Sequence, residues 1–309
     1  MRSYITIDGG TTNTRVNLVK NRCIAKSVKI SAGARVGMDN KSFLAEEIKK
    51  AVAKLSEGEK AEKILASGMI TSEFGLYDLP HISAPAGIAE LHNSMKEVLI
   101  PVISDIPFVF IPGVKINGER LDNTDMMRGE ETELMGLIDN DFADGIYVLP
   151  GSHSKIIKVN SDGKIVNFST MLTGEMIAAL SGGTILKDAV DLNQSETDDD
   201  FLFKGYNYCT SFGINEALFK TRVLKNIFGA TEKEVYSFFE GAVLQAEIKK
   251  IIETSEQNII VGGKTQIKKA MCKLLENCSG KQVLAVEESR ADFATALGAI
   301  KIYEYPCDN

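Results

Sequence analysis

The sequence contains no tryptophan, only three histidines and only five cysteines. The cysteines are odd in number, widely spaced and never arranged as CxxC pairs, which argues against a disulfide framework and against a zinc site. Three histidines leave little room for a histidine-rich metal centre. These shortages favour a protein of the reducing cytoplasm that uses neither disulfides nor zinc.

An excess of positive charge and a long apolar run are missing as well. The formal net charge is −7, which gives no support to binding of nucleic acid or of an anionic membrane. Asp8 interrupts the apolar start, so no signal peptide is expected, and no later apolar run approaches the ~18 residues of a membrane span. With 309 residues, the chain has the length of two domains.

What is present is an order of elements that occurs twice. The first half is predicted to begin with three strands and to continue with alternating helices and strands. These elements are strands Ser3–Asp8, Thr14–Lys20 and Cys23–Ile30, a helix over residues 42–57, strand Glu62–Gly68, a helix over Gly87–Val98, strand Pro107–Pro112 and a helix from about Gly129.

The second half repeats this order. Its predicted elements are strands over residues 145–151, 154–160 and 164–170, a mostly helical stretch from Thr173 to about Glu253, strand Asn258–Gly263, a helix from Thr265 to Asn277, strand Gln282–Glu287 and helix Ser289–Tyr303. Repeats in sequence order usually mean repeats in space. We therefore expect two similar α/β domains with a cleft between them.

Each half opens with a glycine-containing turn that is rich in hydroxyl groups. The first is DGGTTNT, Asp8–Thr14, and the second is PGSHSK, Pro150–Lys155. Glycines let the backbone approach a ligand closely, and successive turn N–H groups form a nest for anionic oxygens. Two such turns could grip a chain of phosphates from both sides. Phosphate would repel Asp8, so its expected role is to hold Mg²⁺, which keeps several waters and uses few carboxylates.

Both turns and several further stretches resemble a known superfamily, the sugar kinase, actin and heat-shock chaperone ATPases. A later glycine pair, Gly262 and Gly263 in NIIVGG, stands at the place of that superfamily's adenosine motif. More narrowly, the chain resembles the 2-dehydro-3-deoxygalactonokinase family in IDGGTTNTR, SGMITSEFG, APAGIAEL, IPGV, DMMRGEETELMG, LPGSHSKIIKV, STMLTGE and ATALGAIKIY. The chain departs from that family at Gly9, where a tryptophan is expected, and over Asp188–Tyr208.

The resemblance implies an α/β fold of the actin-like ATPase type, in which two ribonuclease H-like domains, each a βββαβαβα unit, flank the active-site cleft. The implied N-terminal domain, residues 1–141, carries the substrate site and the first phosphate motif. The implied C-terminal domain, residues 142–309, carries the second phosphate motif and the adenosine motif. ATP and Mg²⁺ are the implied cofactors, with Asp8 as the Mg²⁺ ligand. The implied nucleotide-binding residues are Gly9, Gly10, Thr11, Thr12, Asn13, Gly151, Ser152, His153, Ser154, Lys155, Gly262 and Gly263.

The family's chemistry implies phosphoryl transfer to a hydroxyl, which needs positioning, charge neutralisation and a base near the acceptor. Related sugar kinases carry an acidic residue at the start of a helix just before the second domain. Glu130 occupies that place and is the first choice as catalytic base, with Glu131 and Asp125 behind it. A glutamate there also complements the helix dipole, which is the purely structural alternative.

A sugar acid needs a cation for its carboxylate. Arg128, Arg15, Lys155 and His153 lie in or beside the motifs. Arg128 is the preferred residue, because an arginine can hold a carboxylate by two parallel hydrogen bonds. Ser67, Gly68 and Thr71, which follow a predicted strand, are further candidates for contact with the sugar.

The implied function is ATP-dependent phosphorylation of the 6-hydroxyl of 2-dehydro-3-deoxy-D-galactonate in galactonate catabolism. Two alternatives stay open: a kinase for another ketodeoxy sugar acid, such as 2-keto-3-deoxygluconate, and a non-catalytic sugar sensor that keeps the nucleotide-binding fold. Asp8 and the pair Glu130-Glu131 argue against a sensor, since a pure binder needs neither. The expected partners are the sugar acid and ATP, without nucleic acid or membrane, and size and fold suggest a homodimer.

Overall fold

The structure, a computed structural model, describes residues 2–138, 144–194, 196–263 and 266–306. The chain forms two compact units: unit 1 is Met1–Asp144, Lys158–Phe168 and Ser289–Asn309, and unit 2 is Gly145–Ile157 and Ser169–Glu288. The expected domain boundary between residues 141 and 142 lies outside the described residues, as does the expected helix start at Thr265. The division into domains 1–141 and 142–309 stays a prediction.

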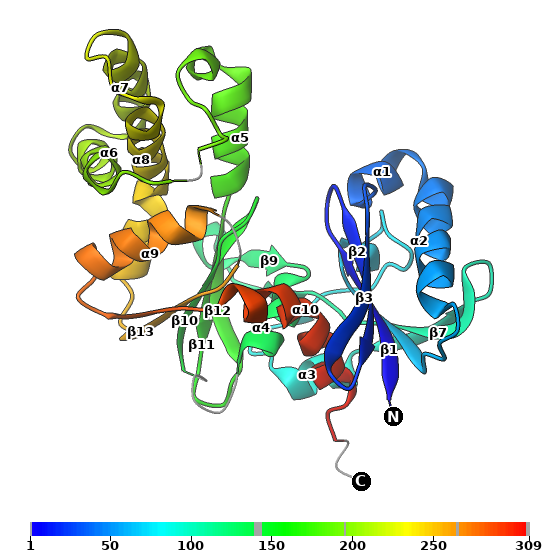
Figure 1. The fold of residues 1–309 in the computed structure, drawn as a ribbon. Helices are drawn as coiled ribbons and strands as arrows, with labels where there is room; N and C mark the ends of the chain where they lie inside the picture. Colours follow the sequence, from blue (N-terminus) through cyan, green and yellow to red (C-terminus); the bar gives the residue numbers. More distant parts are fainter. Residues whose placement is uncertain (1, 139–143, 195, 264–265, 307–309) are drawn as a thin grey trace. The chain divides into compact units, whose positions relative to one another are not determined.

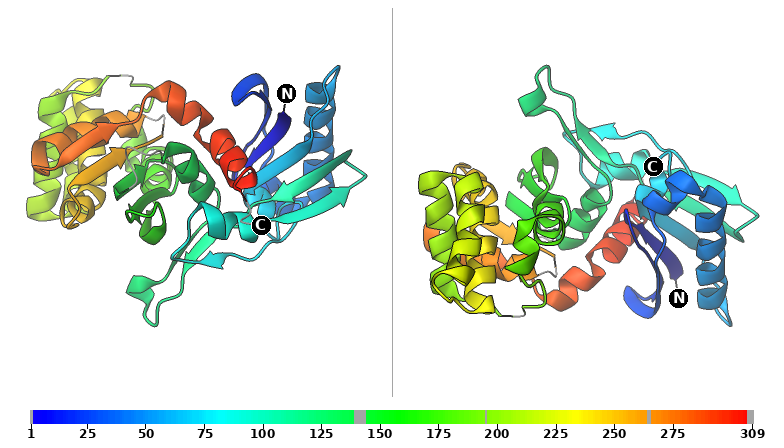
Figure 2. Two further views of the ribbon diagram at one scale, coloured as in Figure 1. Left: turned by 90° about the horizontal axis from the view of Figure 1, so that it is seen from below. Right: turned by 90° about the horizontal axis from the view of Figure 1, so that it is seen from above.

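Unit 1 is built on a six-stranded mixed sheet with the order β3-β2-β1-β4-β7-β6. The central strand β1 is antiparallel to β2 and parallel to β4. Helix α2 (Lys41–Ser56) packs on the sheet through Leu44, Ile48, Val52 and Leu55, which recur at helical spacing and are buried in the core (Figures 1 and 2). The strands are β1 (Ser3–Gly9), β2 (Thr14–Lys20), β3 (Cys23–Ile30), β4 (Lys63–Gly68), β6 (Lys96–Ile100) and β7 (Ser104–Phe110).

One segment of unit 1 differs from the prediction. The helix expected over Gly87–Val98 is wrong beyond its first turns, because α3 (Ile88–Asn93) is short and β6 then pairs antiparallel with β7. A second, three-stranded sheet of order β5-β8-β9 is also new. Its strands are β5 (Ile82–Ser83), β8 (Val114–Ile116) and β9 (Asp125–Met127). Strands this short depend on partners that are distant in sequence, and a local pattern does not show those partners.

The second large sheet has five strands in the order β12-β11-β10-β13-β14 and carries unit 2, except that residues 158–168, which include the end of β11 and the first part of β12, are assigned to unit 1. The order repeats that of the six-stranded sheet. The first three strands of each copy lie side by side in reverse order, and the first strand then pairs in parallel with a strand from later in the chain. The duplication predicted from the sequence is therefore confirmed. The strands are β10 (Gly145–Leu149), β11 (Ser154–Val159), β12 (Ile165–Met171), β13 (Asn258–Val261) and β14 (Gln282–Ala285).

The predicted helical stretch of unit 2 is confirmed. Helices α6, α7 and α8 pack on one another (Figures 1 and 2), and α8 begins with a reciprocal cap between Thr231 and Glu234. In the described part of the chain, no helix combines the length and the apolar character that crossing a bilayer requires. The helices are α5 (Thr173–Gly183), α6 (Asp199–Phe212), α7 (Ile214–Asn226), α8 (Glu232–Ile252) and α9 (Gln266–Cys278).

The last helix, α10 (Glu288–Tyr303), packs against α4 (Glu130–Leu137) in unit 1. A Cβ at Gly298 would lie 1.8 Å from the backbone oxygen of Thr132, and one at Gly136 would lie 1.9 Å from that of Ala294. The two helices thus touch through their backbones, an approach that only glycine permits. This contact anchors α4, the helix that begins with the two predicted acids.

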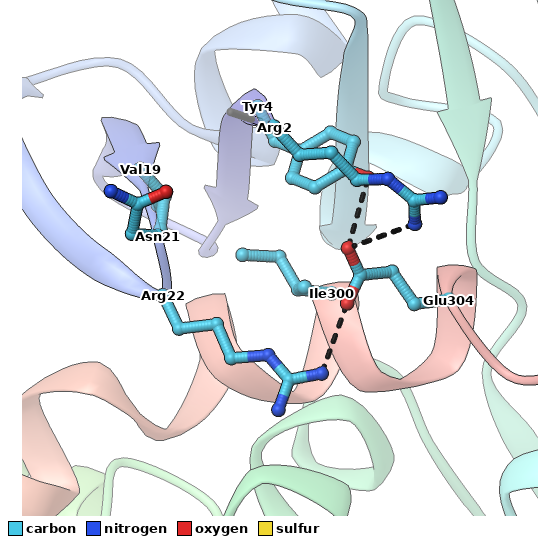
Figure 3. A pocket seen from close by; sticks show the side chains of 7 residues that line it. All are labelled: Arg2, Tyr4, Val19, Asn21, Arg22, Ile300 and Glu304. Carbon is cyan, nitrogen blue, oxygen red and sulfur yellow. Dashed lines mark hydrogen bonds and ion pairs between the residues drawn. The ribbon is translucent and has the colours of Figure 1, made fainter.

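The residue after α10, Glu304, ties the end of the chain to the first hairpin. Its carboxylate accepts the Tyr4 hydroxyl and an Arg22 N–H, each over 3.0 Å, and lies 3.4 Å from Arg2 Nη1 (Figure 3). These groups line a pocket of about 250 Å³. Because Glu304 already forms ion pairs with both arginines, the residues of this pocket are best explained as a structural contact that holds the segment after α10 against the first hairpin.

Candidate active site

The first predicted turn closes on itself at the end of β1. Gly10 N–H donates to the backbone oxygen of Asn13, and the Asn13 amide donates to the Thr12 hydroxyl, each over 2.9 Å. Thr12 is exposed, and Thr11 and Asn13 are partly exposed. The turn therefore presents short hydroxyl and amide groups to the surface, which suits binding of phosphate oxygens.

The carbonyl groups of this turn are engaged by the start of α1 (Ala34–Asp39). Ala34 N–H donates to Gly10 O over 3.1 Å, and Arg35 N–H donates to Thr11 O over 2.9 Å. Gly33 allows the approach, since a Cβ there would lie 2.4 Å from Gly10 O. An anion would be repelled by these carbonyl oxygens. Their hydrogen bonds are supplied by the protein itself, so they need no ligand as a donor.

Asp8 has two other predicted site residues beside it in the sheet. It lies opposite Arg15 in β2 and beside Ser67 in β4. Paired positions place their side chains on the same face of a sheet. Asp8 is partly exposed, whereas Ser67 is buried and its hydroxyl has no hydrogen-bond partner among the described residues. The structure thus gathers a carboxylate, a cation and an unsatisfied hydroxyl.

Three glycines join the elements that carry these groups in unit 1. A Cβ at Gly68 would lie 2.5 Å from Gly9 O, and a Cβ at Gly129 would lie 3.1 Å from Gly68 Cα. Gly68 and Gly129 also have positive φ angles, +79° and +114°, which favour glycine. The ends of β1 and β4 and the start of α4 are therefore in backbone contact, and the residues that flank the three glycines come together.

The departure from the family at Gly9 has a steric explanation. A Cβ at this position would lie 2.7 Å from the backbone nitrogen and 2.8 Å from the Cβ of Ile70. Ile70 belongs to a short 3₁₀ helix, Met69–Thr71, that directly follows β4. The local backbone leaves no room for a tryptophan, or for any other side chain, at position 9.

Arg128, the predicted ligand of the substrate carboxylate, is held by two neighbours. Its Nη1 donates to the backbone oxygen and to the hydroxyl of Thr71, each over 2.6 Å, and its Nη2 lies 3.1 Å from His81 Nδ1. The Thr71 hydroxyl in turn donates to Gly68 O over 3.0 Å. Arg128 is thereby linked to the glycine contact at the end of β4.

No motif in the sequence points to His81. The side chain is half-buried, and this burial, together with the charges of Arg128 and Lys115, lowers the pKa of His81 to about 4. The imidazole is therefore neutral at neutral pH. The one available signal was slight: His81 lies between SGMITSEFG and APAGIAEL, two stretches that carry the family resemblance.

The two adjacent acids at the start of α4 have different environments. Glu131 is fully buried, and both its carboxyl oxygens lie 2.8 Å from the donating Gly129 N, with the Thr132 hydroxyl at 3.1 Å. Burial, with the nearby Glu130 charge as a second cause, raises the pKa of Glu131 to about 8. Glu130 is partly exposed and accepts Arg128 N–H over 3.1 Å. The geometry favours Glu130 as the base, since Glu131 is closed off from any substrate.

Asp125, the third predicted acid, occupies another place. It begins β9 opposite Ile116, at the end of the strand that is remote from Arg128, and its Oδ1 accepts the N–H of Met126 over 2.7 Å. The register therefore places Asp125 in the small sheet, away from the start of α4.

The second predicted turn, in unit 2, repeats the construction of the first. Gly174 N–H donates to Gly151 O over 3.1 Å, and Glu175 N–H donates to Ser152 O over 3.2 Å. A Cβ at Gly174 would lie 2.5 Å from Gly151 O, a close approach like that of Gly33 to Gly10 O, although Gly174 is itself the donor and Gly33 precedes the donor Ala34. The duplication thus extends from the strand order to individual hydrogen bonds.

The side chains of the second turn divide into two groups. Ser154 and Lys155 are buried, and Lys155 Nζ donates to His153 O over 3.0 Å. Ser152 is exposed, and His153 Nε2 lies 3.3 Å from a carboxyl oxygen of Glu175. Ser154 and Lys155 therefore hold the turn in shape, whereas Ser152 and His153 are accessible to a ligand.

The predicted adenosine motif lies beside the second turn in unit 2. Gly262 N–H donates to Val148 O over 2.8 Å, and a Cβ at Gly263 would lie 3.1 Å from Pro150 O. Gly263 also has a φ of +74°. Glycines at these positions let the chain turn directly against the second turn.

Two buried ionisable residues support these motifs without any sign in the sequence. Glu247 in α8 accepts the Thr173 hydroxyl over 2.5 Å and also bonds to Ser154 of the second turn, and burial raises the pKa of Glu247 to about 7. Lys268 in α9 donates to Gly263 O over 3.3 Å. Both residues lie on helices where local patterning predicts only core or surface.

The donor set is compatible with Mg²⁺ bound together with a nucleotide. No three His, Cys, Asp or Glu residues within the described ranges form a group that could hold a metal ion by themselves. Mg²⁺ needs only one or two carboxylates when phosphates and water complete its shell. The partly exposed carboxylate of Asp8, at the entrance to a phosphate-type turn, fits this requirement.

The duplicated sheet, with a glycine turn after the first strand of each copy, defines a protein of the actin-like ATPase fold. Solved structures agree. A Sinorhizobium meliloti protein presumed to be a 2-dehydro-3-deoxygalactonokinase superposes with a TM-score of 0.79 at 22% identity, covering 99% of this chain and 98% of that one. The activator of 2-hydroxyisocaproyl-CoA dehydratase from Clostridium difficile gives 0.52 at 12% identity, with 98% and 95% covered. These likenesses concern the fold, and the predicted fold class is confirmed.

The family model for 2-keto-3-deoxy-galactonokinase matches residues 8–301, and the chain belongs to that family. It is 29% identical to the 2-dehydro-3-deoxygalactonokinase of Escherichia coli K12 over 250 residues, 79% of each chain. Over 128 residues, 41% of this chain and 40% of the relative, it is 34% identical to a probable 2-dehydro-3-deoxygalactonokinase of Rhizobium meliloti. The predicted family and the predicted enzyme class, an ATP-dependent carbohydrate kinase, are confirmed.

The buried carboxyl of Glu131 predicts a pH-dependent stability. Its pKa is raised from 4.5 to about 8, so between these values the folded protein retains a proton that the unfolded chain releases. Its contribution to the free energy of unfolding is therefore complete below pH 4.5 and falls as the pH rises to 8, by at most ~1.4 kcal/mol per pH unit. Urea denaturation at several pH values should show a shallower fall for Glu131→Gln, and equal slopes would contradict the assignment.

Proposed function

We propose that the chain transfers the γ-phosphoryl group of ATP to the 6-hydroxyl of 2-dehydro-3-deoxy-D-galactonate, giving the 6-phosphate. The observation that carries the proposal is the backbone contact among Gly9, Gly68 and Gly129, because it assembles a phosphate-type turn, a polar strand end and an acidic helix start. Membership of the family supports the same reaction. A cytoplasmic location and a homodimer, which go with this function, stay predictions.

On the nucleotide side, backbone and side-chain groups of the chain are proposed to bind ATP and to orient its phosphates. The accessible groups of Thr11, Thr12 and Asn13 in the first turn, and of Ser152 and His153 in the second, are proposed to hold the phosphates, whereas Gly10, Gly151, Ser154 and Lys155 shape the turns. Gly262-Gly263 is proposed to lie against the adenosine. Asp8 would hold Mg²⁺, directly or through water, and the ion neutralises phosphate charge when it is bound. That both turns serve one cleft stays a prediction.

On the acceptor side, Glu130 is proposed to accept the proton of the attacking 6-hydroxyl. Arg128 would bind the substrate carboxylate and so orient the sugar acid, and an oriented acceptor is a large part of phosphoryl transfer. Gly68 and Arg15 are proposed to contact the sugar at the end of β4. The Ser67 hydroxyl, buried and without a partner among the described residues, would join them where substrate binding uncovers this strand end.

The proposed substrate is tested by measuring ADP release against a panel of ketodeoxy sugar acids. We expect the highest kcat/KM with 2-dehydro-3-deoxy-D-galactonate. A preference for 2-keto-3-deoxygluconate would reassign the substrate within the same chemistry. ATP binding without ADP release for any acid in the panel would reject the kinase in favour of a sensor.

Asp8→Asn tests the proposed metal ligand. The substitution keeps the shape of the side chain but removes the charge that Mg²⁺ requires, so we expect at least a 100-fold loss of kcat, in line with several kcal/mol of charge stabilisation. The thermal unfolding midpoint should stay near that of the wild type. Asp162→Asn, at an exposed hairpin turn, is the matched control. Wild-type turnover by Asp8→Asn would refute the metal role.

Glu130→Gln tests the proposed base. A glutamine can still accept the N–H of Arg128 but accepts no proton, so kcat should fall about 10²- to 10⁴-fold while KM for ATP changes little. Glu133→Gln, in the same helical turn, is the matched control and should keep its activity. If Glu131→Gln lost turnover in this way and Glu130→Gln did not, the wrong acid would have been chosen.

A further inference from the structure

The Arg128 guanidinium is held at two of its nitrogens inside unit 1, and His81 supplies one of the two anchors. Arginine has five N–H groups and acts only as a donor. Thr71 accepts at most two of them at Nη1, each over 2.6 Å, and His81 Nδ1 accepts one at 3.1 Å from Nη2. These contacts leave Nε–H and one Nη2–H, the number that a carboxylate takes in a bidentate pair.

The contact with Arg128 fixes the protonation of His81. Because the guanidinium can only donate, Nδ1 is the bare nitrogen and the imidazole proton lies on Nε2. A second proton would place two cations 3.1 Å apart, and the half-buried position opposes it as well. His81 therefore acts as a neutral acceptor throughout the neutral pH range.

His81 is itself confined by its surroundings. The next residue, Ile82, begins β5 and donates its N–H to Gly113 O over 2.9 Å. The imidazole packs on Gly113, where a Cβ would lie 2.6 Å from the ring Cδ2. The glycine makes room for the ring, and a ring held in this way keeps Nδ1 in one place.

We propose that His81 is a positioning residue that fixes the Arg128 guanidinium in the orientation that receives the acid end of the substrate. Two anchored nitrogens define the plane of the group, whereas one would leave it free to turn. His81 thereby sets the preference for a sugar acid over a neutral sugar without touching the reacting atoms. The inference rests on the proposed function, since it requires a carboxylate at Arg128.

The experiment combines calorimetric binding of 2-dehydro-3-deoxy-D-galactonate with steady-state kinetics. His81→Leu removes the acceptor, His81→Asn retains one near the position of Nδ1, and His81→Gln moves it toward the position of Nε2. His92→Leu is the matched control, because His92 lies in the same unit and its Nδ1 contacts Ile302 O at 2.7 Å. A neutral analogue, with an alcohol in place of the carboxylate, serves as the second ligand.

We expect His81→Leu to raise the dissociation constant and the KM of the acid about 10- to 100-fold, with KM for ATP unchanged. Binding of the neutral analogue should hardly change, so the preference for the acid falls. His81→Asn should recover most of this preference, His81→Gln should not, and His92→Leu should match the wild type.

Several outcomes would overturn the inference. One is a His81→Leu variant that keeps the wild-type preference for the acid. Another is an equal loss for the acid and the analogue, which would show a merely structural role. If His81→Leu does not fold, the other two variants decide. An equal preference for the acid over the neutral analogue in His81→Asn and His81→Gln would overturn the inference, because the position of the acceptor would then not matter. Wild-type protein that binds the acid without releasing ADP refutes the proposed function alone, whereas failure to bind any sugar acid refutes both.

Discussion

The backbone contact among Gly9, Gly68 and Gly129 is the constraint on which the candidate site in unit 1 depends. Three segments meet at distances that exclude a Cβ, so the acid at the start of α4 is placed by backbone packing and not by its own side chain. The same helix is held farther along, where Gly136 and Gly298 bring α4 and α10 into contact. A helix fixed at both places cannot slide, and rigid placement of a catalytic group is what phosphoryl transfer requires of a protein.

The phosphate-type turns are stiffened by a second device, which occurs once in each unit. The first N–H groups of a helix lack partners within that helix, and the carbonyls of a tight turn likewise need donors. At the first turn, Ala34 and Arg35 meet Gly10 and Thr11, and the second turn has the same arrangement with α5. Each helix start therefore satisfies the carbonyl groups of its turn, and the N–H groups of the turn other than that of Gly10, which donates to Asn13 O, can serve an anion.

The sequence was informative where a structural feature is local. Apolar runs predicted the strands of the two large sheets except β6, and glycine with flanking hydroxyls predicted both turns, because these signals lie within a few residues. It was uninformative where partners are distant: β6 forms only because β7 lies beside it, and His81 gains its role only because β5 and β8 bring it to Arg128. Likewise, the sequence does not distinguish the two adjacent glutamates of α4, and only the packing shows that Glu131 is buried and Glu130 is partly exposed.

Two groups near Arg128, Glu131 and His81, are neutral at pH 7 and leave its charge available to an incoming carboxylate. A carboxyl with a pKa of about 8, as for Glu131, is mostly protonated at pH 7, so it does not compete for the guanidinium as an ionised neighbour would. His81, with a pKa of about 4, holds the guanidinium without adding charge. A cation that two neutral groups orient selects by geometry, which lets a site distinguish one sugar acid from a general excess of anions.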